Sequence, residues 1–312
     1  MVGGRAATRE VWHAPAKINL WLEITGRRPD GYHTVDTCYQ AIDLADTVIL
    51  EPSETPGVSC TVEGPFAEGA PEGPDNLAVQ AALVLAERTG HEPRLRIRLI
   101  KEIPPGAGLA GGSSDAAAVL VALAHRFAVP EPDDTLVELA AELGADVPFF
   151  LKGGTQHASG IGDRLHPIAP PAERWGILVY PGVAVSTWWA YEAYDREREE
   201  SSPKTAGSIG SAGVGLGWSL ASEQKGINVL APLVCDSFPE VLRAVEVLRD
   251  GPAPCVVMTG SGSGVYSLYA TEAARDADVE RIAVGIQDLP GAHLWPFAFM
   301  DHGVGPTPLR GG

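Results

Sequence analysis

The sequence predicts an α+β protein of two domains, and three observations support this fold class. In the first half, strand-like segments are followed by a helical segment and a further strand, an order that suggests a sheet covered by helices. Near the C-terminus, two strand-like segments flank a glycine-rich turn and precede a helix and a last strand, which make a second α+β unit. The chain has 312 residues, 45% of them hydrophobic, which is enough to bury a sizeable core and to form two domains.

The charge and hydropathy of the chain exclude several classes of partner. The formal net charge is -17 and the pI is near 4.8, whereas a surface that follows nucleic acid or an anionic membrane needs clustered Lys and Arg. No stretch approaches the ~18 consecutive apolar residues of a membrane span, and residues 1–10 lack the apolar core of a signal peptide. We therefore expect a cytoplasmic protein that binds any phosphate group locally.

The cysteines do not indicate a zinc site or a disulfide scaffold. They lie far apart in the sequence and form no C-x-x-C pair. We expect them to be buried as small apolar residues. The four residues are Cys38, Cys60, Cys235 and Cys255.

The first predicted strand, over residues 16–24, alternates apolar and polar side chains as a half-buried strand does. Lys17 and Asn19 therefore share its polar face, roughly 7 Å apart by the rise of a strand. The turn signal Asp30-Gly31 then leads into a second strand, and on this pattern alone Tyr32-His33 is the start of that strand.

The segment up to residue 100 alternates irregular and regular structure. Residues 51–74 are rich in Pro, Gly and Glu and predict a long connection with an edge strand at 57–63. Asp75 is placed to cap a helix that ends at Gly90, and a strand follows over residues 94–100.

Residues 103–117, IPPGAGLAGGSSDAA, contain the spacing G-x-G-x-x-G. A dinucleotide fingerprint needs its glycines to follow a strand directly, but Pro104 and Pro105 intervene here. A flexible linker is also disfavoured, because an apolar helix follows at once with Ser113 or Ser114 placed to cap it. The Gly-Lys-Ser/Thr ending of a Walker loop is absent.

Two interpretations of this glycine-rich segment remain. Glycines let a backbone approach a phosphate closely, and the free N–H groups of a helix start attract an anion, so the segment predicts an anion-binding loop. Tight packing of a glycine-rich helix start is the alternative. Lys17 or Lys101 would supply a cation from elsewhere in the chain.

Asp146 is the first candidate catalytic residue. It follows a predicted helix over residues 133–144 that ends at Gly144, and it precedes the apolar run Val147-Pro148-Phe149-Phe150. A carboxylate in that position is expected to be partly shielded from water. A turn aspartate that bonds to its own backbone is an equally good interpretation of position alone.

The C-terminal half contains a second glycine-dense turn, residues 259–264, between two predicted strands. Such a turn is either a bare hairpin or an anion-binding nest of backbone N–H groups. Residues 201–219 predict a mobile loop and residues 304–312 a disordered tail. The other predicted elements are strands at 176–182, 254–258, 264–270 and 293–299 and helices at 188–200, 239–250 (opened by Pro239) and 271–287.

Four stretches taken together resemble the GHMP kinases. They are APAKINLWLEITGRRPDGYH (14–33), PPGAGLAGGSSDAA (104–117), LGADVPFFLKGG (143–154) and MTGSGSGVY (258–266). The first and third are similar in particular to the branch of the family that phosphorylates 4-diphosphocytidyl-2-C-methyl-D-erythritol. The resemblance covers most of the chain in the right order.

The resemblance implies a fold and a reaction. The fold would combine a domain related to the second domain of ribosomal protein S5, residues 1–166, with a ferredoxin-like domain, residues 167–312, around an active site in the cleft between them. The reaction would be ATP-dependent phosphorylation of the substrate 2-hydroxyl, giving ADP and the 2-phosphate, in the non-mevalonate route of isoprenoid biosynthesis. Mg²⁺ is expected with ATP.

The resemblance also implies roles for individual residues. Asp146 would be the catalytic carboxylate and Lys17 its partner, which favours the ionised carboxylate and counters charge on the phosphoryl oxygens. Asn76 and Lys101 match positions near the nucleotide. The loop that would bind the triphosphate consists of Pro104, Gly106, Ala107, Gly108, Leu109, Ala110, Gly111, Gly112, Ser113 and Ser114.

A further group of residues is implied to bind the substrate. Tyr32 and His33 would hold the cytosine by stacking and by hydrogen bonds to the base edge, which replaces their interpretation as a strand start. Tyr191 matches a second stacking aromatic, although an aromatic run in a helix is also typical of a core. The remaining members are Asn19, Thr187, Gly260, Ser261 and Gly262.

Several alternatives stay open at this point. Ser114 is either a magnesium ligand or a helix cap, so the metal ligands are unknown. A homoserine or mevalonate kinase would share the loop but does not need Asp30-Gly31-Tyr32-His33, and a binding protein without catalysis would not need both Lys17 and Asp146. The expected partner is the small-molecule substrate, and the expected assembly is a monomer or a weak homodimer.

Overall fold

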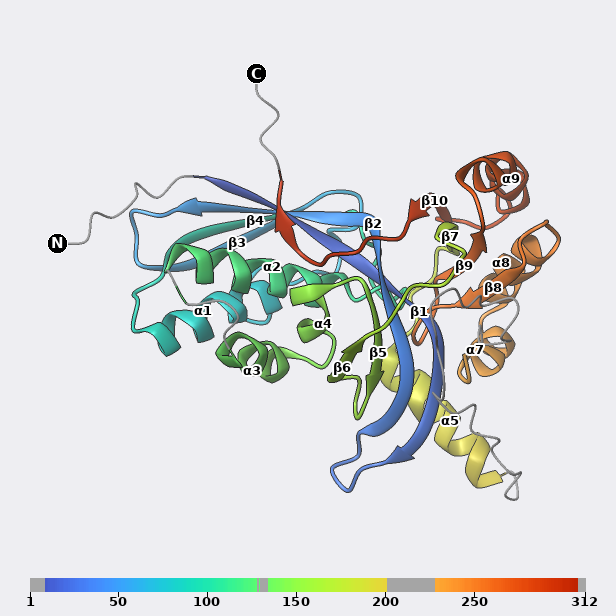
Figure 1. Cartoon of the computed structure of the whole chain (residues 1–312), viewed down its shortest axis with the longest axis horizontal. Helices are drawn as coiled ribbons and strands as arrows, with labels where there is room; N and C mark the ends of the chain where they lie inside the picture. The colour runs from blue at the N-terminus through green and yellow to red at the C-terminus, as the bar shows by residue number, and fades with distance from the viewer. Residues whose placement is uncertain (1–8, 128, 130–133, 201–227, 308–312) are drawn as a thin grey trace.

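The computed structural model describes residues 9–127, 129, 134–200 and 228–307. Two β-sheets organise this part of the chain (Figure 1). The larger has seven strands and the smaller has four. The predicted mobile loop at residues 201–219 lies outside the described residues.

The seven-stranded sheet is built on a long antiparallel hairpin of β1 and β2. Its main strand order is β11-β1-β2-β4-β3, and β5 pairs with β2 and with β6. All of these pairings are antiparallel except that of β3 with β4. The strands are β1 (Glu10–Arg27), β2 (His33–Pro52), β3 (Gly57–Glu63), β4 (Arg94–Ile100), β5 (Thr155–Ser159), β6 (Arg164–Pro167) and β11 (Gly305–Pro306).

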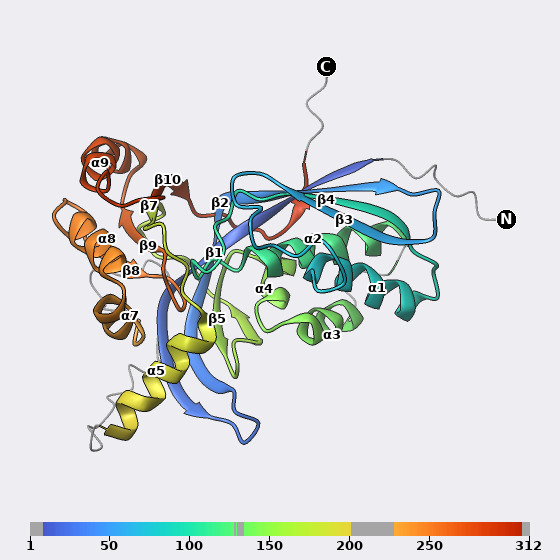
Figure 2. The same ribbon diagram turned by 180° about the vertical axis from the view of Figure 1, so that it is seen from behind.

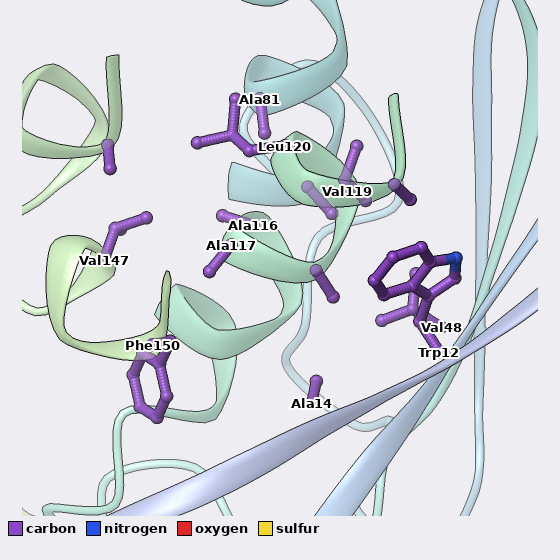
Figure 3. Close-up of a cluster of buried hydrophobic side chains, with 14 of the residues drawn as sticks. Trp12, Ala14, Val48, Ala81, Ala116, Ala117, Val119, Leu120, Val147 and Phe150 are labelled. Carbon is purple, nitrogen blue, oxygen red and sulfur yellow. The ribbon is translucent and has the colours of Figure 1, made fainter. Parts of the chain in front are cut away.

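Four helices cover one face of this sheet, as Figure 1 and the reverse view in Figure 2 show. They are α1 (Leu77–Thr89), α2 (Gly111–Arg126), α3 (Asp134–Leu143) and α4 (Val147–Lys152). The buried stripe of α2 is rich in alanine, so the other helices pack closely around it. In Figure 3, Ala116 and Ala117 of α2 lie near Val147 and Phe150 of α4, while Trp12 and Val48 come from the sheet.

The four-stranded sheet forms the second unit, and its antiparallel strand order is β10-β7-β9-β8. Along the chain, the first strand (β7) is followed by helices, two strands (β8 and β9), a helix and a last strand (β10). In the sheet, β7 lies between β10 and β9, and β8 is at the edge. That is the ferredoxin-like arrangement, as predicted. The elements are β7 (Trp175–Tyr180), α5 (Thr187–Glu200), α7 (Ala231–Ser237), α8 (Pro239–Arg249), β8 (Cys255–Met258), β9 (Val265–Tyr269), α9 (Glu272–Gly285) and β10 (His293–Ala298).

The first strand is buried on both faces, which corrects the prediction of a half-buried strand. Ala16, Ile18 and Leu20 pack in a cluster with apolar side chains of the second sheet, such as Tyr266 and Phe297. The polar face carrying Lys17 and Asn19 is also shielded, at 5% and 2% exposure. The predicted alternation is present, and the polar face is covered by other groups, since Asn19 contacts Thr259 and Lys17 lies over the ring of Tyr39.

Two helix caps differ from the predictions. Asn76, rather than Asp75, caps α1, because its side-chain oxygen accepts a hydrogen bond from Ala78 N at 2.9 Å. The cap of α2 is Ala110 in the left-handed conformation, without a side-chain hydrogen bond, and Ser113 and Ser114 lie inside the first turn. The predicted end of α1 at Gly90 is confirmed, with a left-handed glycine there.

The tail corrects a further prediction. Residues 304–307 are ordered against the first strand through β11, and Thr307 N donates to Val11 O at 2.8 Å. Short helices α4 and α7 were not predicted, because each spans only a few residues around a proline. The domain boundary at 166/167 stays a prediction.

The predictions on cysteine burial and on membrane-spanning segments can be compared with the described part of the structure. Cys38, Cys60 and Cys255 are buried, whereas Cys235 is only partly buried. In the described ranges, no helix is both long enough and apolar enough to cross a membrane.

The close packing of Gly303 yields a stability prediction. A Cβ atom at Gly303 would lie 2.0 Å from Phe150 O, a backbone atom that cannot move aside alone, whereas a Cβ at Gly305 would meet nothing within 4 Å. We expect Gly303→Ala to lower the free energy of unfolding by about 1–3 kcal/mol, the usual cost of overpacking. Gly305→Ala is the matched control, and urea denaturation measures both. Equal stability of the two variants would contradict the packing argument.

Candidate active site

A cavity of about 1020 Å³ is lined by residues from both halves of the chain. Its polar lining includes Lys17 and Asn19 from β1, Asp146 before α4, and Thr187 and Tyr191 from α5. Every residue that the sequence singled out for the site lines this cavity except Ser113, Ser114 and Gly262. Segments that are far apart in the sequence therefore meet around one space.

Lys17 is a buried cation at the wall of the cavity. Its Nζ donates to Asn19 Oδ1 at 2.8 Å and lies 5.2 Å from the ring centroid of Tyr39. Burial lowers the pKa of Lys17, and the negative charge of Asp146 opposes that shift. The Asn19 amide is fixed in turn, because its Nδ2 donates to Thr37 Oγ1 at 2.8 Å.

Asp146 stands at the N-cap position of α4 with its carboxylate free of the backbone. No side-chain hydrogen bond caps the helix there, so the interpretation as a self-bonding turn aspartate is wrong. Burial raises the pKa of Tyr39 well above its ordinary value, and the charge of Asp146 and a hydrogen bond to its carboxylate add to the shift. Tyr39 therefore acts as a neutral hydrogen-bond donor beside Asp146.

The glycine loop, residues 104–112, follows a path that few side chains allow. Gly106 and Gly108 have φ of 62° and 73°, and Ala110 has φ of 55° although it is not a glycine. A left-handed alanine costs about 1–2 kcal/mol, so the surrounding contacts must hold it there. Lys17 supplies one of these contacts, since its backbone N donates to Leu109 O at 3.1 Å.

The glycine loop packs directly against the second glycine segment, residues 259–264. Ser263 N donates to Gly106 O at 3.0 Å, and Gly264 N donates to Ala107 O at 3.1 Å. A Cβ atom at Gly108 would lie 2.1 Å from Thr259 O, so a side chain there would separate the two segments. These glycines are thus required for close approach as well as for conformation.

The N-terminal turn of α2 is open toward a ligand. The first N–H groups of a helix have no intrahelical partner and lie at the positive end of its dipole. A Cβ atom at Gly112 would meet nothing within 4 Å. Both Gly111 and Gly112 line the cavity, so this turn can bind an anionic group such as a phosphate.

Lys101 is committed to two buried carboxylates. Its Nζ forms ion pairs with Asp46 and, at 2.5 Å, with Asp115 Oδ2. Asp46 Oδ1 also accepts hydrogen bonds from Glu102 N and Ile103 N at 2.6 and 2.9 Å. Through Lys101, these two carboxylates join the strand end before the glycine loop to the N-terminal part of the helix after it.

This buried triad of Asp46, Lys101 and Asp115 has one carboxylate more than it has cations. Burial raises the pKa of Asp115 to about 7, with Lys101 opposing the shift and Asp46 adding to it. The pKa of Lys101 is raised overall, because its two carboxylates outweigh the effect of burial. Lys101 therefore stays charged but is held by protein groups before any ligand arrives.

Asn76 also has its polar atoms satisfied within the protein. Besides capping α1, its Nδ2 donates to Pro71 O at 2.6 Å. The residue lines the cavity but holds the loop before α1 in place.

The far end of the cavity is aromatic. Tyr32, at the tip of the β1–β2 hairpin, is 62% exposed although it lines the cavity, which leaves its ring free for a planar ligand. The rings of His33 and Tyr191 lie 4.9 Å apart, and His33 Nε2 lies 2.8 Å from Asp195 Oδ1. Tyr191 is partly buried, so it serves both as packing and as a wall.

Besides Tyr39, four residues near the site were not predicted from the sequence. Asn228 anchors the second glycine segment, because its Nδ2 donates to Met258 O and Gly260 O at 2.8 and 2.7 Å. The others are Asp46, Asp115 and Asp195. Only Asp46, an acidic residue inside a strand pattern, carried a signal that could have revealed it.

The carboxylates at the cavity are not gathered into a metal site. No group of three or more His, Cys, Asp or Glu side chains in the described ranges is placed to hold a metal. Four aspartates line the cavity, and two of them, Asp30 and Asp115, are ion-paired with basic residues, which leaves Asp75 and Asp146. Ser114 is fully buried, and its hydroxyl has no hydrogen-bond partner among the described residues.

Known proteins share this fold and these segments. Residues 76–154 match the family model "GHMP kinases N terminal domain". The 4-diphosphocytidyl-2-C-methyl-D-erythritol kinase of Citrifermentans bemidjiense is 39% identical over 271 residues, which cover 86% of this chain and 92% of that protein. Its counterpart in Burkholderia pseudomallei is 37% identical over 273 residues, with 87% and 89% covered.

Solved structures agree with this family. A crystal structure of 4-(cytidine 5'-diphospho)-2C-methyl-D-erythritol kinase is similar with a TM-score of 0.67 at 33% identity, covering 93% of this chain and 99% of that one. A homoserine kinase from Cytophaga hutchinsonii reaches a TM-score of 0.75 at 18% identity, covering 98% and 100%, which shows the shared fold alone.

The fold and the glycine segments thus define a kinase of the GHMP class, with its two-domain α+β architecture. Within that class, the chain belongs to the 4-diphosphocytidyl-2-C-methyl-D-erythritol kinase family.

The triad predicts a pH dependence of stability. A carboxyl whose folded pKa is raised binds more protons in the native state than in the unfolded one, so it destabilises the fold as pH rises from about 4 to about 7. Asp115→Asn removes this titration. As pH rises from about 4 to about 7, we expect the free energy of unfolding of the variant minus that of the wild type to increase by at least ~1 kcal/mol. Urea titrations at several pH values measure it, with exposed Asp288→Asn as control; a constant difference would contradict the prediction.

Proposed function

We propose that the protein transfers the γ-phosphoryl group of ATP to the 2-hydroxyl of 4-diphosphocytidyl-2-C-methyl-D-erythritol, giving ADP and the 2-phosphate in the non-mevalonate route to isoprenoids. The observation that carries the proposal is one cavity that combines three features. They are an anion-binding glycine loop, a buried Lys17 close enough to Asp146 for their charges to interact, and an aromatic end with Tyr32 and His33.

The chemistry follows from the residues at the middle of the cavity. The substrate hydroxyl loses its proton as it attacks the γ-phosphorus, and the uncapped Asp146 carboxylate is free to accept that proton. Lys17 donates to Asn19 with one of its three N–H groups, which leaves the others for Asp146 and the phosphoryl oxygens. Tyr39 lines the same cavity, and burial together with the negative charge of Asp146 raises its pKa, so it stays neutral beside that carboxylate.

Binding is divided between the two glycine segments. The glycine loop and the first turn of α2 would hold the ATP phosphates through backbone N–H groups and the helix dipole. On the other side, Thr187 Oγ1 and Ser261 Oγ lie 3.0 Å apart in a hydrogen bond beside Gly260, where the diphosphate of the substrate would bind. Phosphoryl transfer depends on such positioning more than on covalent chemistry.

Mg²⁺ would enter with ATP, since phosphate oxygens and water supply most of its ligands in kinase sites. A single protein carboxylate is compatible with that mode, and Asp75 and Asp146 both line the cavity without an ion pair to a basic residue in the described ranges. When bound, the ion would neutralise the β and γ oxygens.

We further propose a cytoplasmic location and a monomer or weak homodimer.

The experiment that tests the proposal measures ADP release by the purified protein with ATP and Mg²⁺. We expect turnover of 4-diphosphocytidyl-2-C-methyl-D-erythritol and none of mevalonate or homoserine, the acceptors of the alternative GHMP kinases. Turnover of either competitor in place of the cytidine compound would overturn the assignment. Binding of ATP without any turnover would instead favour a protein that has lost catalysis.

Asp146→Asn is the sharpest test of mechanism. The amide keeps the size of the side chain but cannot accept a proton, so kcat should fall by at least ~100-fold while the affinities for ATP and substrate stay within about threefold. Steady-state kinetics and calorimetric titration separate the two effects. Asp250→Asn, an exposed change at the end of α8, is the matched control. Undiminished turnover would remove Asp146 from its role.

A further inference from the structure

We propose that Asp195 is a positioning residue that fixes the tautomer of His33 and so makes the site select cytosine over uracil. The proposal rests on the proposed function, because it concerns the cytidine end of the same cavity. Asp195 belongs to the polar run DREREE of α5 and does not itself line the cavity.

α5 crosses the hairpin of β1 and β2 and then diverges from its tip in both whole-chain views (Figures 1 and 2). Trp188, Tyr191 and Asp195 are spaced three and four residues apart, so they lie on one face of the helix. Tyr191 contacts the ring of His33, and Asp195 reaches the same imidazole one turn further on. The helix therefore holds His33 by both its ring face and its edge.

The carboxylate of Asp195 is itself held at both oxygens. Oδ1 lies 2.8 Å from His33 Nε2, and Oδ2 lies 3.0 Å from Arg27 Nη1. The His33 side chain is only 10% exposed and that of Asp195 25%, so the contact is sheltered, whereas Arg27 is 57% exposed. A sheltered contact held from two sides gives the imidazole one orientation.

The chemistry of the pair decides which nitrogen carries the proton. An ionised carboxylate can only accept a hydrogen bond, so Nε2 must be the N–H donor. In the neutral imidazole, Nδ1 is then a hydrogen-bond acceptor. His33 lines the cavity next to the exposed ring of Tyr32, where a base would stack.

An acceptor at this point distinguishes the two pyrimidines. Cytosine carries an amino group, a donor, at the position where uracil carries a carbonyl oxygen. An Nδ1 acceptor bonds to the amino group and opposes the carbonyl, since two acceptors leave both unsatisfied. Selection for cytosine would thus depend on a residue outside the cavity that never touches the base.

Asp195→Asn reverses this arrangement without removing the contact. The Arg27 guanidinium is always a donor, so the amide oxygen of the new side chain would face Arg27 and its NH₂ group would face His33. The imidazole would then accept at Nε2 and donate from Nδ1. The same two hydrogen bonds remain possible, and only the sense of the bond to His33 changes.

The test compares the binding of cytidine 5'-diphosphate and uridine 5'-diphosphate by calorimetry. We expect Asp195→Asn to lower the ratio of their affinities by about tenfold, the effect of one misdirected hydrogen bond. With 4-diphosphocytidyl-2-C-methyl-D-erythritol as substrate, KM should rise while kcat and the KM for ATP stay within about twofold. Asp195→Glu keeps an acceptor and should restore part of the preference, and His33→Ala should abolish the difference between the variants.

Glu197→Gln, an exposed change on the same helix, removes the same charge and should leave the affinity ratio unchanged. Equal losses of affinity for both nucleotides in Asp195→Asn would overturn the proposal and give Asp195 a structural role only. An unchanged ratio would overturn it too. If the wild-type protein fails to phosphorylate the cytidine substrate, the proposed function fails instead, whatever the binding ratio shows.

Discussion

The site depends first on a buried lysine shared by two carboxylates. Asp46 holds the backbone where β4 ends, and Asp115 lies in α2 just after its first turn, so Lys101 joins the two ends of the glycine loop. A buried ion pair gains little net stability, because desolvation offsets the attraction, and its value here is geometric. The loop between these anchors can then take up strained conformations, including the left-handed Ala110, that a free loop would relax.

The middle of the glycine loop contacts the other half of the protein. Its carbonyl groups accept hydrogen bonds from the N–H groups of the second glycine segment. The absence of a Cβ at Gly108 lets the two backbones come into contact. Asn19 links β1 to the same region of the second sheet, since its backbone N donates to Thr259 Oγ1 at 3.0 Å and its backbone O accepts from Tyr266 Oη at 2.8 Å. Strand, loop and turn thus define the cavity jointly, and none of them could be repositioned alone.

The sequence revealed those parts of the site whose chemistry is carried by local pattern. Alternation placed Lys17 and Asn19 on one face, and glycine spacing marked both loops. Contacts between residues far apart in the sequence have no local pattern that predicts them. From the sequence alone, Asp115 is an ordinary acidic residue near a helix start, and Asp195 belongs to a run of charged residues typical of a solvated face. The burial of the polar face of β1 escaped prediction for the same reason, because Thr259, which contacts the Asn19 side chain, lies far along the chain.

The contacts of the last described residues bear on how the protein is made. Val304 N donates to Phe150 O at 2.9 Å, Met300 N donates to Ala41 O at the same distance, and β11 closes against β1. The helix that follows Asp146 is therefore packed from behind by residues synthesised about 150 positions later. The carboxylate before this helix thus gains its full support only after the glycine loop and the second glycine segment have both been synthesised.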